Sequence, residues 1–169
     1  RDGLAGIQPG PAVAGVDQVA IADGLSSLAV VEDDGGLRVF SLPGLAEREV
    51  RGLEARVARA RFLIGGRSLV AAGRDGSVSV LLEVPRVAVT NGGTETLRLD
   101  RWLFPPNLTV VVPDDEIARR LALREQVVVE RAAPVWQVVR AMPAMAMRPT
   151  AIAPSHRDRS FMVGDEGGG

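Results

Sequence analysis

The strongest indication of the fold comes from two similar stretches, LAVVEDDGGLRVFSL (residues 28–42) and LVAAGRDGSVSVLLE (residues 69–83). A shift of 41 positions aligns them without a gap. Six pairs of identical or similar residues then coincide: Ile21 with Phe62, Leu28 with Leu69, Asp34 with Asp75, Gly35 with Gly76, Leu37 with Val78 and Val39 with Val80. A repeat of this length with several strands in each unit is typical of a propeller blade.

The local chemistry of the repeat also indicates strands. Alternation such as Leu37-Arg38-Val39-Phe40 places every second side chain on one face of a sheet. Asp-Gly between such strands favours a tight hairpin in which both central residues have a positive φ. We expect an outer strand of the first unit at residues 49–53.

We therefore predict an all-β fold, a β-propeller with WD-like blades of about 41 residues that is either small or partial. A third copy begins near Thr150, and Phe161 follows Leu69 by 92 positions, close to two repeat lengths. This spacing predicts one domain over residues 1–169. Its units lie at about 16–53 and 57–84, with a degenerate unit at 85–149 and a partial unit at 150–169.

Three segments needed separate interpretation. Residues 46–57 fit either an amphipathic helix or a strand, and we favour the strand because the repeat requires one and Gly52 weakens a helix by about 1 kcal/mol. Residues 115–123 fit a helix or a strand equally well, so this segment stays open. Residues 108–112 form a β-branched run between prolines and predict a strand.

Composition excludes several classes of function. The chain has 169 residues, of which 46% are hydrophobic and 24% charged, with a net charge of −1. A broad nucleic-acid surface needs a basic face, so we expect no nucleic-acid partner. All 20 basic residues are Arg and no Cys is present, which excludes lysine chemistry, thiolate nucleophiles and disulfides. We expect neither a metal nor a cofactor.

The ends and the hydropathy suggest a piece of a larger protein. The chain starts at Arg1-Asp2-Gly3 and stops at Gly167-Gly168-Gly169, so we expect a fragment of a longer chain. No stretch reaches the roughly 18 apolar residues that span a membrane, and no signal peptide is visible. We therefore expect that this segment does not itself cross a membrane.

Five arginines form a candidate anion site. Arg forks suit phosphate and carboxylate groups, and these residues lie close together in the sequence. They are Arg56, Arg59, Arg61, Arg67 and Arg74. The alternative interpretation is a solvated strand face, with acidic residues nearby to balance the charge.

Catalytic and metal sites have weaker indications. His156, the only histidine, lies between Ser155 and Asp158, but sequence proximity does not make a catalytic triad. The acidic pairs and triplets at residues 33–34, 114–116 and 165–166 lack the ligand spacing of an EF-hand loop. We interpret all of them as turn and cap residues, and we expect no catalytic site.

Several phrases in the chain resemble one known family. They run through residues 75–83, 87–89, 97–99 and 102–105, and through residues 153–161 to Gly164-Asp165. Together they resemble the large insert domain of the long-form permease subunits of bacterial phosphate-specific ABC transporters. In that family a WD-like β-propeller is inserted after the first transmembrane helix on the periplasmic side. The WD dipeptide itself is absent here.

The resemblance implies a non-catalytic interaction or sensing domain on the periplasmic face of the bacterial inner membrane. It implies other transporter subunits or the phosphate-binding protein as partners, and it carries no ligand residue over to this chain. Two alternatives remain: a propeller scaffold unrelated to transport, and an enzyme that uses His156 with an acidic partner.

Overall fold

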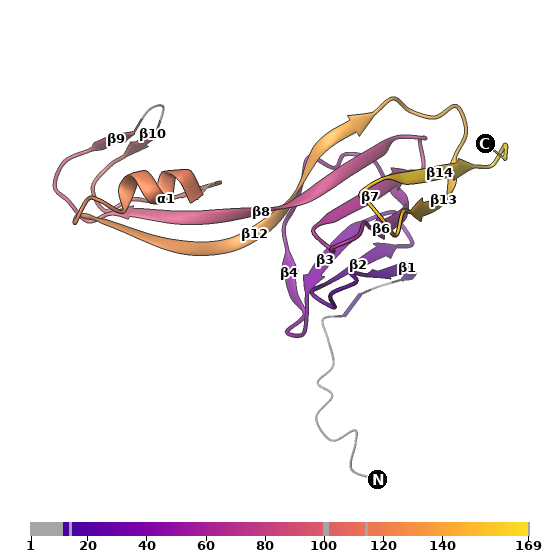
Figure 1. Ribbon diagram of the computed structural model, residues 1–169, viewed down its shortest axis with the longest axis horizontal. Coiled ribbons are helices and arrows are strands. Elements are labelled where there is room, and N and C mark those ends of the chain that lie inside the picture. The colour runs from indigo at the N-terminus through magenta and orange to yellow at the C-terminus, as the bar shows by residue number, and fades with distance from the viewer. Residues whose placement is uncertain (1–11, 14, 100–101, 114, 169) are drawn as a thin grey trace, which may run out of the picture. The chain divides into compact units, whose positions relative to one another are not determined.

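The structure is a computed structural model that describes residues 12–13, 15–99, 102–113 and 115–168, and its secondary structure is almost entirely strands (Figure 1). In chain order the elements are β1 (Val16–Ile21), β2 (Ser27–Glu32), β3 (Leu37–Ser41), β4 (Ala46–Arg48), β5 (Val50–Arg51), β6 (Val57–Phe62), β7 (Ser68–Gly73), β8 (Val78–Asn91), β9 (Leu97–Leu99), β10 (Trp102–Phe104), β11 (Thr109–Val112), α1 (Asp115–Leu121), β12 (Val127–Met142), β13 (Pro149–Pro154) and β14 (Phe161–Asp165).

The all-β prediction is confirmed, and the sheets are curled. The first sheet has the order β1-β2-β3-β4, and the second has the order β5-β12-β8-β7-β6, with β11 also paired to β8. Two hairpins, β9–β10 and β13–β14, make separate two-stranded sheets. Within the described part of the chain these sheets do not close into a propeller ring.

Three hairpins share one register. In β1–β2 Ile21 lies opposite Leu28, in β6–β7 Phe62 lies opposite Leu69, and in β13–β14 Pro154 lies opposite Phe161. The pairs are related by shifts of 41 and 92 positions, the two offsets that the sequence shows. Each hairpin also carries an irregularity at the same place, at Val16/Gln18, Val57/Arg59 and Pro149/Ala151.

Backbone hydrogen bonds at both ends of these hairpins repeat at the same offsets. At one end, the N–H groups of Ala22, Leu63 and Ser155 each donate to a serine carbonyl five residues later, over 2.9 Å in all three cases. At the other end, an N–H after the second strand donates to a carbonyl before the first strand. These bonds are Asp33 to Gly15 (3.0 Å), Arg74 to Arg56 (2.7 Å) and Glu166 to Arg148 (3.1 Å). The three hairpins are therefore copies of one structural unit.

The Asp-Gly turns differ from the predicted geometry. Gly35 and Gly76 have φ values of 88° and 86°, but Asp34 and Asp75 keep negative φ. The Gly35 N–H donates to Glu32 O over 2.8 Å, and the Glu32 N–H donates to Gly36 O over 2.8 Å. This is a type I turn followed by a left-handed glycine, which needs one positive φ instead of two.

The three segments that needed separate interpretation in the sequence all contain defined elements. Residues 46–57 contain β4 and β5 and no helix, so the strand interpretation is confirmed. The outer strand lies slightly earlier than predicted, because β4 at 46–48 pairs with β3, whereas β5 pairs with β12. The strand predicted at 108–112 is present as β11. The segment left open at 115–123 contains α1, whose residues Ile117 and Leu121 are buried one turn apart.

Residues 85–149, for which we expected a degenerate unit, contain an extension of the second repeat. Strand β8 continues without a break from its pairing with β7 to Asn91 and pairs there with β11. The chain returns through α1 to β12, which lies beside β8 as β4 lies beside β3. The third repeat therefore follows the second by 92 positions instead of 41, because extra chain lies between the third and fourth strands of the second repeat.

The chain divides into two compact units, one formed by residues 1–82 and 137–169 and the other by 83–136. In the first unit, a core cluster links the second and third repeats through Leu63, Val70, Ala72, Val78 and Ile152, with Met142, Met145, Phe161 and Val163 packed on it. The second unit has its own core, in which α1 and the β9–β10 hairpin contribute to the cluster of Val87, Val89, Phe104, Val112, Ile117 and Leu121.

Substitution of two leucines near the end of α1 tests the packing of the core in the second unit. Leu121 is fully buried, whereas Leu123 is 90% exposed. We expect Leu121→Ala to lower the free energy of unfolding by about 2–5 kcal/mol, because the truncation leaves a cavity. The matched variant Leu123→Ala should change it by less than about 0.5 kcal/mol. Urea unfolding followed by tryptophan fluorescence measures both, since Trp102 packs against this core. Equal effects of the two variants would contradict this packing.

Candidate functional site

Two of the candidate arginines lie beside the Asp-Gly turn of the first repeat. Arg56 Nη1 lies 2.9 Å from Asp34 Oδ2, and Arg74 Nη2 donates to the carbonyl of Asp33 over 2.6 Å. The backbone of Arg74 also donates to that of Arg56. Both guanidinium groups therefore bind the turn of the preceding repeat, and they join repeat one to repeat two.

The turn aspartates accept hydrogen bonds that favour their charged form. The N–H of Gly36 donates to Asp34 Oδ1 over 2.7 Å, and this bond, followed by the charge of Arg56, holds the pKa of Asp34 below its ordinary value. The pKa of Asp75 is lowered in the same way by the hydroxyl and the backbone N–H of Ser77. These carboxylates are components of the turns and are not available to act as acids near neutral pH.

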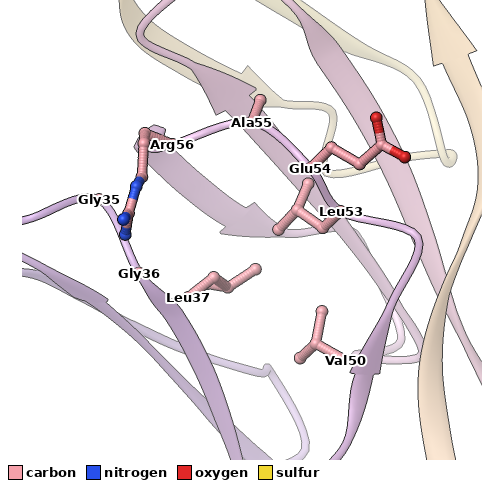
Figure 2. A pocket seen from close by; sticks show the side chains of 8 residues that line it. All are labelled: Gly35, Gly36, Leu37, Val50, Leu53, Glu54, Ala55 and Arg56. Carbon is pink, nitrogen blue, oxygen red and sulfur yellow. The ribbon is translucent and has the colours of Figure 1, made fainter.

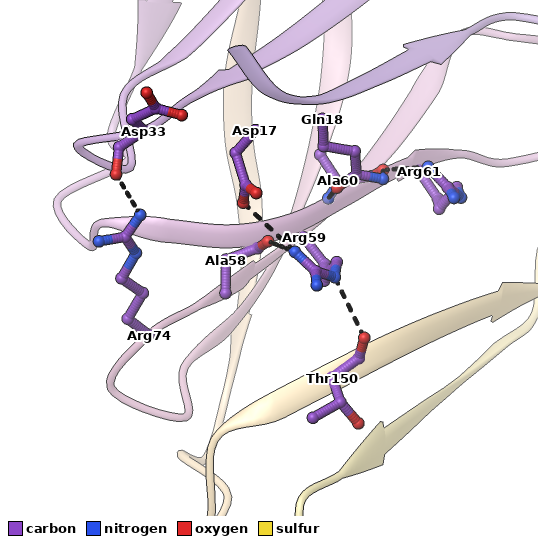
Figure 3. A network of polar contacts seen from close by, with 9 residues as sticks. All are labelled: Asp17, Gln18, Asp33, Ala58, Arg59, Ala60, Arg61, Arg74 and Thr150. Atoms are coloured by element: carbon purple, nitrogen blue, oxygen red, sulfur yellow. Dashed lines mark hydrogen bonds and ion pairs between the residues drawn. The ribbon is translucent and has the colours of Figure 1, made fainter. Parts of the chain in front are cut away.

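A second set of contacts joins the first strands of successive repeats (Figure 3). The Gln18 side chain on β1 binds both backbone groups of Ala60 on β6, each over 3.0 Å. Arg59 on β6 donates from Nε to the carbonyl of Thr150 on β13 over 3.1 Å, and its Nη1 lies 3.3 Å from Asp17 Oδ2. Gln18 and Arg59 are 41 positions apart, so the same repeat position connects each repeat to the next.

The remaining two arginines lie elsewhere. Arg61 donates to the carbonyl of Ala60 over 3.4 Å. Arg67 is exposed in the turn between β6 and β7, at the opposite end of that hairpin from Arg56 and Arg74. A six-residue strand is about 20 Å long, so Arg67 cannot share one phosphate with Arg56. The five arginines thus do not gather at one site, and four of them bind carbonyl or carboxylate oxygens within the protein.

A shallow hollow of about 210 Å³ lies beside the first of these places (Figure 2). It is formed by the turn at Gly35-Gly36, by Leu37, by Val50 and by residues 53–56. Its lining is apolar at Leu37, Val50 and Leu53, whereas the carboxylate of Glu54 points away from the hollow in the figure. The hollow is too small and too open to enclose a substrate, since ligand pockets usually measure about 300–1,000 Å³.

His156 lies in an exposed turn between β13 and β14. The hydroxyl of Ser155 accepts hydrogen bonds from the N–H groups of Arg157 and Asp158, over 3.2 and 3.4 Å. Asp158 accepts from the hydroxyl and N–H of Ser160, which lower its pKa. Ser155 and Asp158 therefore stabilise the turn with their hydrogen bonds. This segment shows no hydrogen bond from a nucleophile to a base.

Acidic residues do not gather into a metal site in the described part of the chain, where no group of three or more His, Asp or Glu residues converges. Asp165 Oδ1 accepts the N–H of Gly167 over 2.8 Å, which is a turn contact like that of Asp34. Of the acidic triplet at 114–116, Asp114 lies outside the described residues, and so do the side chains of the other two.

Two comparisons with known proteins were negative: no family model matches the chain, and no curated protein is significantly similar to it. Among the described residues, no helix has both the length and the apolar character needed to cross a membrane.

Sequence reasoning singled out Arg59 but missed its partners, and it missed Gln18 altogether. One signal could have found Gln18, because the shift of 41 positions places it on Arg59. Two long polar residues at the same position of a repeat suggest an equivalent contact. The acceptor Thr150 O is a backbone atom, which no side-chain pattern can indicate.

The lowered pKa values of the turn aspartates predict that the protein loses stability in acid. A carboxyl whose pKa is lowered in the folded state stabilises the fold above its unfolded pKa, and this stabilisation is lost as the pH falls through the folded value. Asp34, Asp75 and Asp158 all have a pKa below the ordinary 3.8. We therefore expect the free energy of unfolding to decrease as the pH falls below about 4.

The matched variant replaces all three aspartates by asparagine, which keeps a carbonyl oxygen to accept the turn hydrogen bonds. Its unfolding free energy should depend less on pH between about 4 and 2 than that of the unchanged protein. Urea unfolding at several pH values measures both. Parallel pH profiles would show that these carboxylates do not contribute as described.

Proposed function

We propose that the chain is part of a WD-like β-propeller that acts as a non-catalytic interaction domain. The observation that carries the proposal is the set of equivalent hydrogen bonds in the three repeats, at Ala22, Leu63 and Ser155 and at Asp33, Arg74 and Glu166. Propellers are built by radial repetition of such sheets. The shared geometry of the three hairpins supports the interpretation that each belongs to a blade of the same kind.

The arrangement of strands within the repeats gives further support. The first strands β1, β6 and β13 contact one another in that order, and Gln18 and Arg59 bridge them. In the first repeat, each later strand pairs with the one before it, so the sheet grows outward from β1 to β4. Neighbouring first strands with sheets growing outward are the arrangement that a propeller requires around its axis.

The chemistry of the described surface supports binding instead of catalysis. The carboxylates and hydroxyls near His156 form turn contacts, and four of the five candidate arginines bind oxygens within the protein. Polar groups held in this way stabilise turns and repeat interfaces. We therefore assign the proposed binding role to the exposed loops and strand edges of the surface.

We further propose, on the sequence phrases alone, that this domain belongs to a phosphate ABC transporter permease and lies on the periplasmic face of the bacterial inner membrane. The phrases fall on the second repeat, on β9 and β10, and on the β13–β14 hairpin. In this role the domain contacts other transporter subunits or the phosphate-binding protein. It would belong to a longer membrane protein and would itself carry neither the transport path nor the nucleotide site.

A second candidate is a propeller scaffold unrelated to transport. This candidate requires only the repeats. The two candidates differ in their partner, so binding to the phosphate-binding protein distinguishes them.

The test uses surface plasmon resonance with the immobilised 169-residue chain and the phosphate-binding protein of the same organism. The transporter proposal predicts saturable binding that depends on whether phosphate is bound, and no binding of a solute-binding protein for another ligand. Equal binding of both proteins, or none, would contradict the transporter role and leave the scaffold.

Calorimetric titration with phosphate, with sulfate as the control, separates an interaction domain from a sensing domain. Because four of the five arginines already have partners within the protein and Arg67 lies apart from Arg56 and Arg74, we expect no saturable heat specific to phosphate. Saturable phosphate binding that is lost in Arg56→Ala and Arg74→Ala would contradict this expectation and establish a sensor site at the turn.

A further inference from the structure

The turn after α1 presents a leucine at the surface of the second unit. Leu123 is 90% exposed, the highest value among the exposed large apolar side chains of the described residues. Hydrogen bonds hold this turn in place, because the Arg124 N–H donates to Leu121 O over 2.9 Å and the Val127 N–H donates to Arg124 O over 3.1 Å. The buried side chain of Leu121 anchors it to the core. A partner that binds Leu123 therefore has little conformational entropy to remove.

Leu123 differs from the two other exposed apolar residues that an arginine follows. Val139 lies within the paired strand β12, where it is part of the sheet surface. Met147 lies against Gly167, where an added Cβ atom would be 2.6 Å from the sulfur of Met147. Only Leu123 of these three is in a turn between elements, and no ion pair joins the arginine that follows it, Arg124, to another described residue. The turn thus offers an apolar side chain and a free positive charge together.

The hollow beside the first Asp-Gly turn, here called the apolar hollow, has a matching size and lining. The side chains of Leu37, Val50 and Leu53 point toward one another in Figure 2 and line it with apolar surface. A cavity of about 150 Å³ holds benzene, which is larger than a leucine side chain. The apolar hollow measures about 210 Å³, and its rim is held by the hydrogen bond from the Val57 N–H to Gly35 O. It therefore has room for one apolar side chain.

The free charges beside the two features are opposite. Glu54 follows Leu53 in the sequence as Arg124 follows Leu123, and its exposed carboxylate points away from the apolar hollow in Figure 2. No ion pair joins Glu54 to another described residue. Consecutive Cα atoms are about 3.8 Å apart, and glutamate and arginine both have long side chains. A leucine side chain in the hollow would therefore bring the arginine that follows it within reach of Glu54.

We propose that the apolar hollow binds Leu123 of a second copy of this chain, and that Arg124 of that copy pairs with Glu54 at the rim. The two surfaces differ, so the contact is heterologous. It is also small, which gives weak association with a dissociation constant of about 10 µM to 1 mM. In dilute solution the chain is then monomeric, so the expected effect of Leu123→Ala on unfolding there is unchanged. The proposal does not depend on the role in phosphate transport, because it uses two surfaces of this chain alone.

Sedimentation equilibrium of the 169-residue chain measures the association. We expect the average mass to rise with concentration between about 10 µM and 1 mM. Leu123→Asp should weaken the association by about tenfold or more, because it would bring a charge into the apolar hollow. Arg124→Glu should weaken it severalfold, since it would place two carboxylates together. Both side chains are exposed, so the fold should stay intact. A chain that stays monomeric over the whole range would overturn the proposal.

Charge reversal on both surfaces tests whether Glu54 and Arg124 meet. Glu54→Arg alone should weaken the association severalfold, whereas the double variant with Arg124→Glu should restore it to within about twofold of the unchanged chain. Arg131→Glu is the control, because Arg131 is another exposed arginine of the second unit without an ion pair to a described residue, and it should change the association by less than about twofold. No recovery in the double variant, or equal weakening by the control, would overturn the proposal.

A mixture of two variants tests whether the two surfaces belong to different copies. The Leu123→Asp variant keeps the apolar hollow and Glu54, whereas the Glu54→Arg variant keeps Leu123 and Arg124, so a mixed pair can form one intact contact. With one variant fluorescently labelled, sedimentation velocity should show that the two associate with each other more strongly than either does with itself. If the unchanged chain associates but the mixture does not, the copies meet at another surface and the proposal is wrong.

Discussion

The hydrogen bonds that close both ends of the β1–β2, β6–β7 and β13–β14 hairpins are the constraint on which the rest of the structure depends. One set joins the ends of each hairpin near Ala22, Leu63 and Ser155, and the other joins the chain before and after it. Because side chains alternate along a strand, a slip of one residue would turn each buried side chain to the other face. The bonds therefore determine which side chains form the core and which face the next repeat.

This register explains the roles of the charged residues. Gln18 and Arg59 bridge successive first strands because they occupy the same repeat position. Arg56 and Arg74 both contact the first Asp-Gly turn, since the chain before and after the β6–β7 hairpin passes there. Three of the five arginines that suggest a phosphate site in the sequence thus make contacts between repeats. Because four of the five candidate arginines bind oxygens within the protein, we propose an interaction role for the exposed edges and loops.

The sequence predicted the first two repeats well, because their offset of 41 positions has no gap and their turns keep Asp-Gly. It also predicted the strands of the β13–β14 hairpin. It could not indicate what lies between, because the alternating apolar pattern of β8 continues past Leu82, where the partner strand changes from β7 to β11. Periodicity reports which face is buried, but not which strand lies alongside. The segment of helix α1 stayed open because its second half and the two residues after it, Arg-Arg-Leu-Ala-Leu at 119–123, also fit a strand.

The central claim is that three hairpins are copies of one unit, and amide hydrogen exchange measured by NMR tests it most directly. The amides of Ala22, Leu63 and Ser155 form one equivalent set, and those of Asp33, Arg74 and Glu166 form the other. Within each set, all three should exchange at least about a hundredfold more slowly than in an unstructured peptide. Exchange of Ser155 and Glu166 at the unstructured rate, with Leu63 and Arg74 protected, would show that the third hairpin is not a copy and would contradict the account.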